Sequence, residues 1–251
     1  QHLVDQWVDD IIKFNIDPVL IHYKNGGGVH WCGIIIAVGV LLAVLYSRYV
    51  ATRENENKDA IVDLVLYAIP VSVLFARTYY VAFSWDSYKD NLIDVFKIWE
   101  GGIAIYGGII GGLIAAFITC KLEKLNFYNL LDCAGMSLLI GQGIGRWGNY
   151  ANQEAFGVFT NGNYGMMSDK IISYIEAHPE LYGLEGVSDI PRYIEENNLF
   201  VHPTFFYEFA WCMLGVLVLY IITRKFRKFS GQTFLCYGIW YGLERTVVEG
   251  L

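Results

Sequence analysis

Long apolar runs constrain this chain of 251 residues more than any other feature. A helix needs about 20 predominantly apolar residues to cross a bilayer, and six stretches approach or reach that length. Only 17% of the residues are charged, whereas soluble domains carry about a quarter. The sequence therefore predicts an all-α, polytopic membrane helix bundle that forms a single integral membrane domain over residues 1–251. The six expected spans are Val29–Ser47, Ala60–Phe83, Gly101–Cys120, Leu130–Tyr150, Pro203–Thr223 and a last one that begins near Gln232.

Lysine and arginine residues in the short loops predict the orientation of these spans. The basic loops SRYVATRENENK, KLEK and TRKFRK alternate with acidic loops along the chain, and basic loops lie on the cytoplasmic side. The N-terminus is therefore expected outside. The polar, acidic stretch 152–202 lies on the outer side too, where we expect a small extracytoplasmic cap.

Composition argues against several classes of function. A net charge of -7 offers no basic patch for nucleic acid. The five cysteines are scattered singly without a CxxC pair, so neither a metal site nor a disulfide framework is expected, and each is interpreted as a small buried hydrophobe. The acidic start QHLVDQWVDD is not a signal peptide, and we expect both ends of the chain to be trimmed.

Polar residues interrupt the spans mainly at their outer ends. They lie in or beside ARTYYV, GGIAIYGGIIGG, GRWGNYANQE, HPTFFYE and GLERTVVEG. An ionisable residue inside a span costs at least about 2.5–3.5 kcal/mol and usually faces the bundle interior or a water-filled cavity. Arg77, Arg146 and Arg245 therefore predict a cationic pocket open to the outer leaflet. A guanidinium matches phosphate bidentately, so the expected ligand is a phospholipid headgroup.

Two alternatives to this pocket remain open. Each arginine could instead pair with a glutamate and simply hold helices together. A rival function is a membrane transporter or lipid-binding protein with an outer-leaflet anion pocket, because broken helices with charges at membrane depth also occur there; spans one to three and four to six nevertheless show no repeat. The candidate partners for the arginines are Glu154, Glu208, Glu244 and Glu249.

Glycines and histidines near the outer ends have structural interpretations as well. The third span holds overlapping G-x-x-x-G pairs that allow helices to approach closely. Around Gly145 and Gly148 we expect the chain to leave helical geometry and line a cavity. His30 is interpreted chiefly as an interfacial packing residue, and His202 as part of a helix start before Pro203. The paired glycines are Gly107, Gly108, Gly111 and Gly112.

The stretch GRWGNYANQE resembles the signature of the prolipoprotein diacylglyceryl transferases, a family of bacterial membrane enzymes with the pattern G-R-x-G-N-[FY]-x-N-x-E. Five further matches follow the family order along nearly the whole chain: HWCG, ARTYYV, GGIAIYGGIIGG, HPTFFYE and ERTVVEG. The family has seven spans with the N-terminus outside, so the resemblance implies that the last span lies beyond Leu251.

The resemblance implies a reaction. The diacylglyceryl group of phosphatidylglycerol moves to the lipobox cysteine thiol in the signal peptide of a preprolipoprotein, a thioether forms, and glycerol phosphate is released. The active site would face the outer leaflet of the bacterial cytoplasmic membrane, among membrane lipids, and no metal or organic cofactor is implied.

Roles for individual residues follow from the matched motifs. Tyr106, Arg146 and Arg245 are expected to be catalytic. Many family members have histidine, taken as the base, where this chain has Tyr106. A tyrosine has an unperturbed pKa near 10 and is a poor base at neutral pH unless a nearby arginine stabilises its phenolate, so the identity of the base stays open. The expected substrate-binding residues are Arg77, Gly107, Gly108, Gly145, Asn149, Asn152, Glu154, Glu208, Glu249 and His30.

Overall fold

A computed structural model of the chain describes residues 15–23, 28–54, 56–89, 91–98, 101–160 and 165–248. The chain forms two compact units. Unit 1 comprises Gln1–Leu42, Leu138–Ile221 and Cys236–Leu251. Unit 2 comprises Ala43–Ser137 and Ile222–Leu235.

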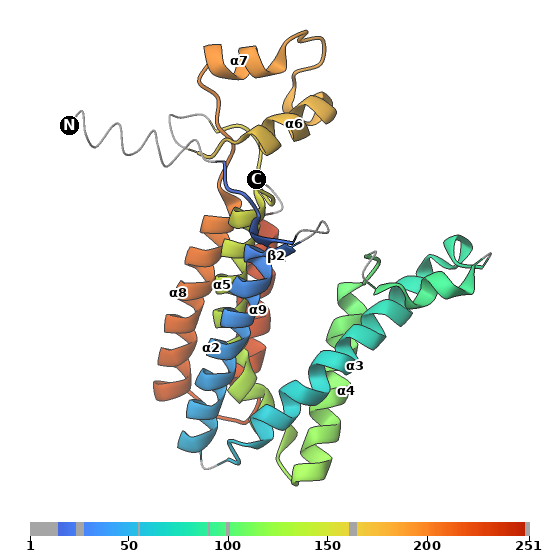
Figure 1. Ribbon diagram of the computed structural model, residues 1–251. Helices are drawn as coiled ribbons and strands as arrows, with labels where there is room; N and C mark the ends of the chain where they lie inside the picture. The colour runs from blue at the N-terminus through green and yellow to red at the C-terminus, as the bar shows by residue number, and fades with distance from the viewer. Residues whose placement is uncertain are drawn as a thin grey trace. The chain divides into compact units, whose positions relative to one another are not determined.

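Long helices make up most of the described residues (Figure 1). Among the described residues, α2, α3, α4 and α8 are long and apolar enough to cross a membrane by length and composition. The chain is therefore a multi-pass helical membrane protein. The more polar α5 and α9 do not meet that criterion, so the expectation of six spans stays a prediction for these two. The bounds are α2 Trp31–Arg53, α3 Ala60–Phe83, α4 Ile105–Glu123, α5 Phe127–Asn152, α8 Thr204–Lys225 and α9 Gln232–Val248.

Helix bounds agree with the sequence where apolar length alone sets them. The predicted second span coincides with α3. The first span was expected to start at about Val29, and α2 starts two residues later, because an antiparallel hairpin of β1 (Val19–His22) and β2 (Gly28–His30) precedes it. The helix of the third span starts only at Ile105, because Gly101 and Gly102 adopt φ values of +91° and +74°.

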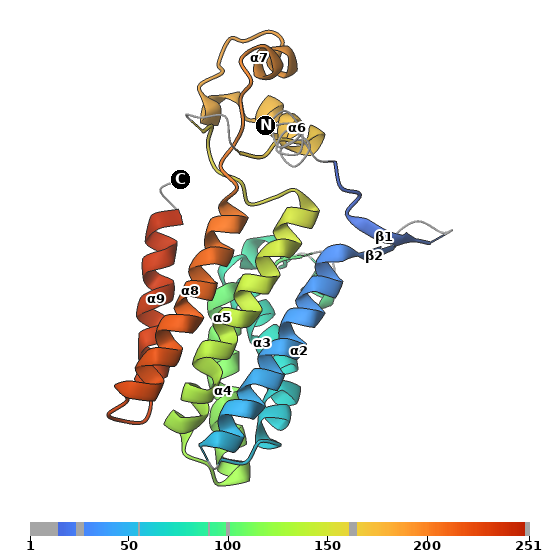
Figure 2. The same cartoon turned by 90° about the vertical axis from the view of Figure 1, so that its left-hand side faces the viewer.

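Close helix packing in unit 1 depends on glycines. The parts of α2, α5, α8 and α9 that belong to this unit lie side by side (Figures 1 and 2). A Cβ atom on Gly39 of α2 would lie 3.3 Å from the Gly141 carbonyl oxygen of α5, and one on Gly148 would lie 3.1 Å from Cys32 Sγ. The prediction that the chain leaves helical geometry at Gly145 and Gly148 is wrong, since α5 runs unbroken to Asn152. Gly148 instead lets α5 approach α2.

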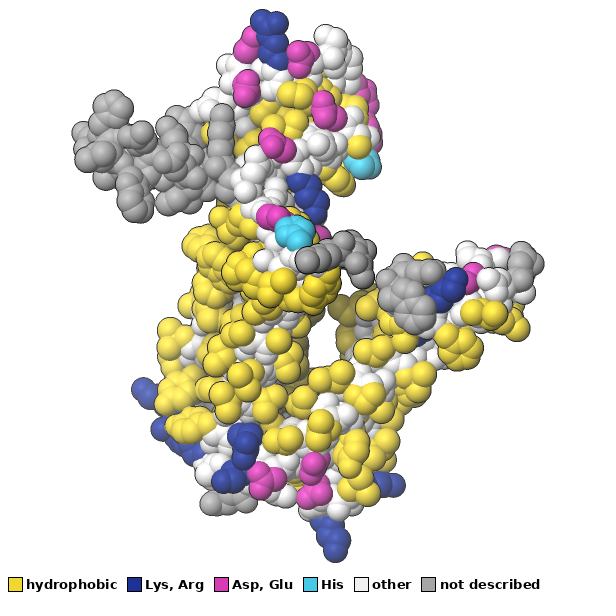
Figure 3. All heavy atoms as spheres, viewed as in Figure 1, with side chains coloured by type: hydrophobic (Ala, Val, Ile, Leu, Met, Phe, Trp, Pro, Cys, Tyr) yellow, Lys and Arg dark blue, Asp and Glu magenta, His cyan; other side chains and the backbone are white. Residues whose placement is uncertain are grey.

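The segment 153–203, called the insert below, joins α5 to α8 and has its own core. It contains α6 (Asp169–Ala177), the 3-10 helix η4 (Pro179–Tyr182) and α7 (Ile190–Glu196). Figure 3 shows Asp and Glu side chains on its surface, whereas hydrophobic side chains cover the helices. The buried core consists of Met166, Met167, Ile171, Ile175, Leu184, Ile190, Ile194, Phe200 and Val201, together with Phe205 at the start of α8.

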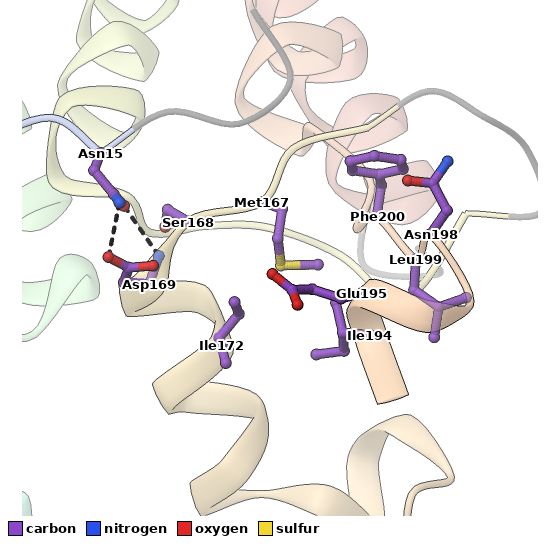
Figure 4. Close-up of a pocket in the computed structure, with 10 residues that line it drawn as sticks. All are labelled: Asn15, Met167, Ser168, Asp169, Ile172, Ile194, Glu195, Asn198, Leu199 and Phe200. Carbon is purple, nitrogen blue, oxygen red and sulfur yellow. Dashed lines mark hydrogen bonds between the residues drawn. The ribbon is translucent and has the colours of Figure 1, made fainter. Parts of the chain in front are cut away.

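A cavity of about 160 Å³ lies in the insert between α6 and α7 (Figure 4). At its edge, Asn15 Nδ2 donates to Asp169 Oδ2 at 2.7 Å, and the Asp169 backbone N–H donates to Asn15 Oδ1 at 3.0 Å. This reciprocal pair fastens the N-terminal stretch to the start of α6.

Unit 2 contains α3 and α4, which pack along each other (Figure 1). A Cβ atom on Gly111 would lie 2.8 Å from the Ser72 Cα atom, and one on Gly107 would meet the backbone of Phe75 and Ala76. For these two glycines the predicted close approach of helices is confirmed. Gly108 and Gly112 face α3 at ordinary contact distances of 3.9 and 3.4 Å.

A buried acid in unit 2 ties the α8–α9 loop to α5. Asp132, 4% exposed, accepts hydrogen bonds from the backbone N–H groups of Gly231 (2.7 Å) and Phe234 (3.0 Å). Its carboxylate also lies 3.2 Å from Arg227 Nη2. Three donors therefore converge on one buried carboxylate.

We expect Asp132→Ala to lower the free energy of unfolding by about 3 kcal/mol, because it leaves a partly buried guanidinium and two N–H groups without this acceptor. Thermal unfolding of the detergent-solubilised protein checks this. Asp86→Ala is the control, since Asp86 forms an exposed ion pair with Lys89 and should change stability little. Equal effects of the two substitutions would contradict the structural role of Asp132.

Candidate functional site

One carboxylate in unit 1 bridges two arginines from different helices. Glu208 of α8 places Oε2 at 2.9 Å from Arg146 Nη1 of α5 and Oε1 at 3.4 Å from Arg245 Nη1 of α9. Glu208 is only 1% exposed, whereas the side chains of Arg146 and Arg245 are 21% and 38% exposed. The pairing of arginines with a glutamate, left open as the alternative to a lipid-binding pocket, is present for Arg146 and Arg245.

The charges of this trio do not cancel. The trio of Arg146, Glu208 and Arg245 has two formal positive charges and one negative, and the Glu244 carboxyl lies within electrostatic reach of all three. A guanidinium has five N–H donors, and Glu208 contacts Nη1 of each arginine. The partly exposed guanidiniums are the part of the trio that an anion can reach.

A second buried carboxyl lies beside the trio. Glu244 of α9 is 2% exposed and within electrostatic reach of Glu208, Arg146 and Arg245. The Cys212 thiol of α8 lies 3.6 Å from its Oε1. The sequence suggested Glu244 as an arginine partner, whereas in the structure its carboxylate also contacts this thiol.

The end of α5 is a tight turn that carries the rest of the signature. Asn152 Nδ2 donates to Glu154 Oε1 at 3.0 Å, and the Glu154 backbone N–H donates to the Asn149 carbonyl oxygen at 3.0 Å. Gln153 and Ala155 adopt left-handed conformations with φ of 53° and 54°. Non-glycine residues rarely adopt such φ values, and no local sequence pattern predicts them here.

This turn also connects the two helices that hold the ion pair. Thr204 Oγ1, at the start of α8, donates to the Ala155 carbonyl oxygen. Gln153 Nε2 donates to the Ile16 carbonyl oxygen at 2.5 Å, and Lys170 Nζ to that of Asn152 at 2.6 Å. The turn therefore helps to fix α5 and α8 relative to each other within unit 1.

Arg77 lies in unit 2 and differs from the other two arginines. It is 5% exposed and donates to backbone carbonyl oxygens of the segment 94–102 at 2.5 to 3.4 Å. These contacts favour a structural role over the predicted contact with a lipid phosphate. The expectation that Arg77 shares one pocket with the trio stays a prediction, because the trio belongs to unit 1.

Tyr106 also lies in unit 2, in the first turn of α4. Its side chain is 66% exposed, and its ring centroid lies 6.3 Å from that of Tyr79 on α3. Gly107 beside it packs against α3, as described above, so the backbone at Tyr106 is held while its side chain is exposed.

The remaining predicted site residues have few informative contacts. A Cβ atom on Gly145 would meet nothing within 4 Å in the described residues, so one face of α5 is open beside Arg146. His30 in β2 is exposed, with Nδ1 3.2 Å from the Gly28 carbonyl oxygen. Glu249 lies outside the described residues. His202, interpreted as structural, places Nδ1 3.1 Å from the Tyr207 hydroxyl.

Comparison with known proteins extends over nearly the whole chain. A family model described as prolipoprotein diacylglyceryl transferase matches residues 18–251. A Listeria welshimeri protein named phosphatidylglycerol--prolipoprotein diacylglyceryl transferase is 41% identical over 241 residues, which cover 94% of this chain and 79% of that protein. A Halalkalibacterium halodurans protein of the same name is 39% identical over 227 residues, covering 89% of this chain and 71% of that protein. A Bacillus licheniformis protein of the same name is 38% identical over 240 residues, which cover 96% of this chain and 80% of that protein.

Proposed function

The chain belongs to the prolipoprotein diacylglyceryl transferase family, and on this basis we propose that it transfers the diacylglyceryl group of phosphatidylglycerol to the lipobox cysteine thiol of preprolipoproteins. The observation that supports this best is the trio of Arg146, Glu208 and Arg245, a buried carboxylate that holds two partly exposed guanidiniums. A phosphodiester headgroup carries one negative charge and would bind to these guanidiniums.

The chemistry requires stabilisation of a leaving phosphate. The substrate thiol is reactive as its thiolate. Its sulfur forms a bond to the glyceryl carbon, the bond from that carbon to the phosphate oxygen breaks, and the electron pair leaves with glycerol phosphate while a base takes the thiol proton. Negative charge accumulates on the phosphate oxygens, where Arg146 and Arg245 would stabilise it.

Glu208 would orient the arginines rather than bind the lipid, because each of its oxygens already contacts one guanidinium. Asn149 and Asn152 would donate hydrogen bonds to the headgroup, and Glu154 would accept one from a glycerol hydroxyl. Gly145 and Gly108 would leave room for the substrates, whereas Gly107 packs against α3 and would contribute by holding the first turn of α4. His30 and Glu249 complete the proposed substrate-binding set.

Tyr106 has two possible roles, a phenolate base or a neutral hydrogen-bond donor to the phosphate or glycerol. We favour the neutral donor. Tyr106→Phe should then reduce the transfer rate by one to two orders of magnitude, about 1.5–3 kcal/mol for a lost charge-assisted hydrogen bond. Tyr106→His should keep substantial activity.

Rate measurements across pH separate these roles. If Tyr106→Phe has no detectable activity and Tyr106→His is fully active with a lower pH optimum, Tyr106 is the base. Full activity of Tyr106→Phe would exclude both roles.

We propose that the protein lies in the bacterial cytoplasmic membrane with its N-terminus and the insert outside, so that the insert forms the extracytoplasmic cap. Basic residues in the last turns of α2, α4 and α8 support this orientation. In a background without native cysteines, Arg192→Cys, at an exposed position of the insert, should react with an impermeant thiol reagent added outside, whereas Lys225→Cys should not. Labelling of Lys225→Cys from outside would overturn the orientation.

The function itself is tested with purified protein, radiolabelled phosphatidylglycerol and a lipobox peptide. We expect label to move to the peptide, and a peptide with serine in place of cysteine to remain unlabelled. If the protein shows a thermal unfolding transition, and so is folded, and binds the lipid without any transfer, the rival lipid-binding or transport function is favoured.

A further inference from the structure

Arg77 is a buried arginine whose donors all go to the backbone of one segment. Nε donates to the carbonyl oxygen of Val95, Nη1 to those of Gly101 and Gly102, and Nη2 to those of Asp94 and Lys97. An arginine has five N–H groups, and five hydrogen bonds are present. No donor is left over for a phosphate unless this arrangement is broken.

The surroundings of Arg77 stabilise the charge without a carboxylate contact to the guanidinium among the described residues. Carbonyl dipoles surround its edge, and the Tyr88 ring lies 5.1 Å from its Cζ atom. The nearby Asp94 carboxylate pairs with Lys97 Nζ at 2.7 Å instead. Through five hydrogen bonds the guanidinium therefore holds the backbone at residues 94–97 and at Gly101 and Gly102.

This braced segment leads directly into Tyr106. Gly101 and Gly102 turn the chain with positive φ values, and the Ala104 backbone N–H donates to the Ala76 carbonyl oxygen at 3.0 Å. Ala104 precedes the first turn of α4 and has no side chain that could cap it. The position of that first turn thus depends on how the preceding segment is held.

We infer that Arg77 is a positioning residue for the transfer reaction, which fixes the backbone at residues 94–97 and at Gly101 and Gly102, and through it the first turn of α4 and Tyr106. It does not bind the lipid phosphate. The inference rests on the proposed function, and it assigns Arg77 a role different from those of Arg146 and Arg245.

A double-mutant cycle tests this coupling. Arg77→Gln, Tyr106→Phe and the double variant are compared by kcat and by KM for phosphatidylglycerol. Arg77→Gln should lower kcat by about tenfold to a hundredfold, because a misplacement of about 1 Å at a reacting group costs that much, and should change KM less than about twofold. In the Tyr106→Phe background, Arg77→Gln should lower kcat less than about threefold further.

Three results would overturn the inference. They are multiplicative effects on kcat in the double variant, a large rise in KM with kcat unchanged, and full activity of Tyr106→Phe. If the wild-type protein transfers no label, the proposed function itself fails, so the two failures can be told apart.

A pair of glycine variants keeps the test valid if Arg77→Gln does not fold. Gly101→Ala and Gly102→Ala introduce comparable backbone strain, since both positions have positive φ. A Cβ atom on Gly101 meets nothing within 4 Å in the described residues, whereas one on Gly102 would lie 2.6 Å from Arg77 Nη1 and 2.8 Å from the Tyr80 ring. Gly102→Ala should therefore lower kcat at least about fivefold more than Gly101→Ala; equal losses would overturn the inference.

Discussion

Arg146→Ala is expected to reduce diacylglyceryl transfer by at least about a hundredfold while the protein still folds and inserts into the membrane. A bidentate, charge-assisted contact that strengthens in the transition state contributes roughly 3 kcal/mol or more, which corresponds to about two orders of magnitude in rate. Folding should persist because Glu208 keeps Arg245 as a partner. Arg146→Lys should restore little activity, since an ammonium lacks the planar fork.

Initial rates with labelled lipid and thermal unfolding of the same preparations check this expectation. Arg192→Ala is a matched control, because Arg192 on α7 forms an ion pair with Glu196 in which both side chains are more than half exposed. It should leave transfer unchanged. Normal transfer by folded Arg146→Ala would remove the phosphate-binding role.

Glu208→Ala is expected to affect both stability and activity. It would leave two guanidiniums facing each other without their shared counter-charge, and breaking a buried ion pair by removing one partner costs about 3–5 kcal/mol. The transfer rate should fall at least as far as in Arg146→Ala, because both arginines lose the carboxylate that orients them. Glu208→Gln preserves the shape and should lose less stability.

The matched control is Glu196→Ala, which removes an exposed carboxylate of the insert. Its unfolding temperature should stay near that of the wild-type protein. If Glu208→Ala unfolds at the same temperature as this control, Glu208 does not hold the two arginines together.

Apolar length predicted the helices well, because the cost of exposing polar backbone in lipid sets their extent. α3 matches its prediction at both ends. The hairpin before α2 escaped prediction because its strands are short and partly polar. The course of α5 through Gly145 and Gly148 was also missed, since a glycine that admits a neighbouring helix and one that breaks a helix look alike in a sequence.

For the site, the motifs identified the residues but not their partners. The sequence placed Arg146, Arg245 and Glu208 near one end of their helices, yet only the packing of α5, α8 and α9 shows that one carboxylate serves both arginines. Arg77 has the same residue type and expected depth, but its neighbours are carbonyl groups of a loop whose path no local pattern determines. The residue type therefore predicted a charged side chain, whereas only the tertiary structure shows which groups that charge contacts.

The insert between α5 and α8 has a consequence for biogenesis. About 60 residues separate Arg146 from Glu208 in the sequence, so at about 5–20 residues per second the ribosome makes the arginine several seconds before its counter-charge. If α5 crosses the membrane as its sequence predicts, a lone guanidinium should delay its release into lipid until α8 arrives. A nascent chain that stalls within the insert would then expose an unsatisfied charge, a feature by which quality-control proteases could recognise an incomplete enzyme.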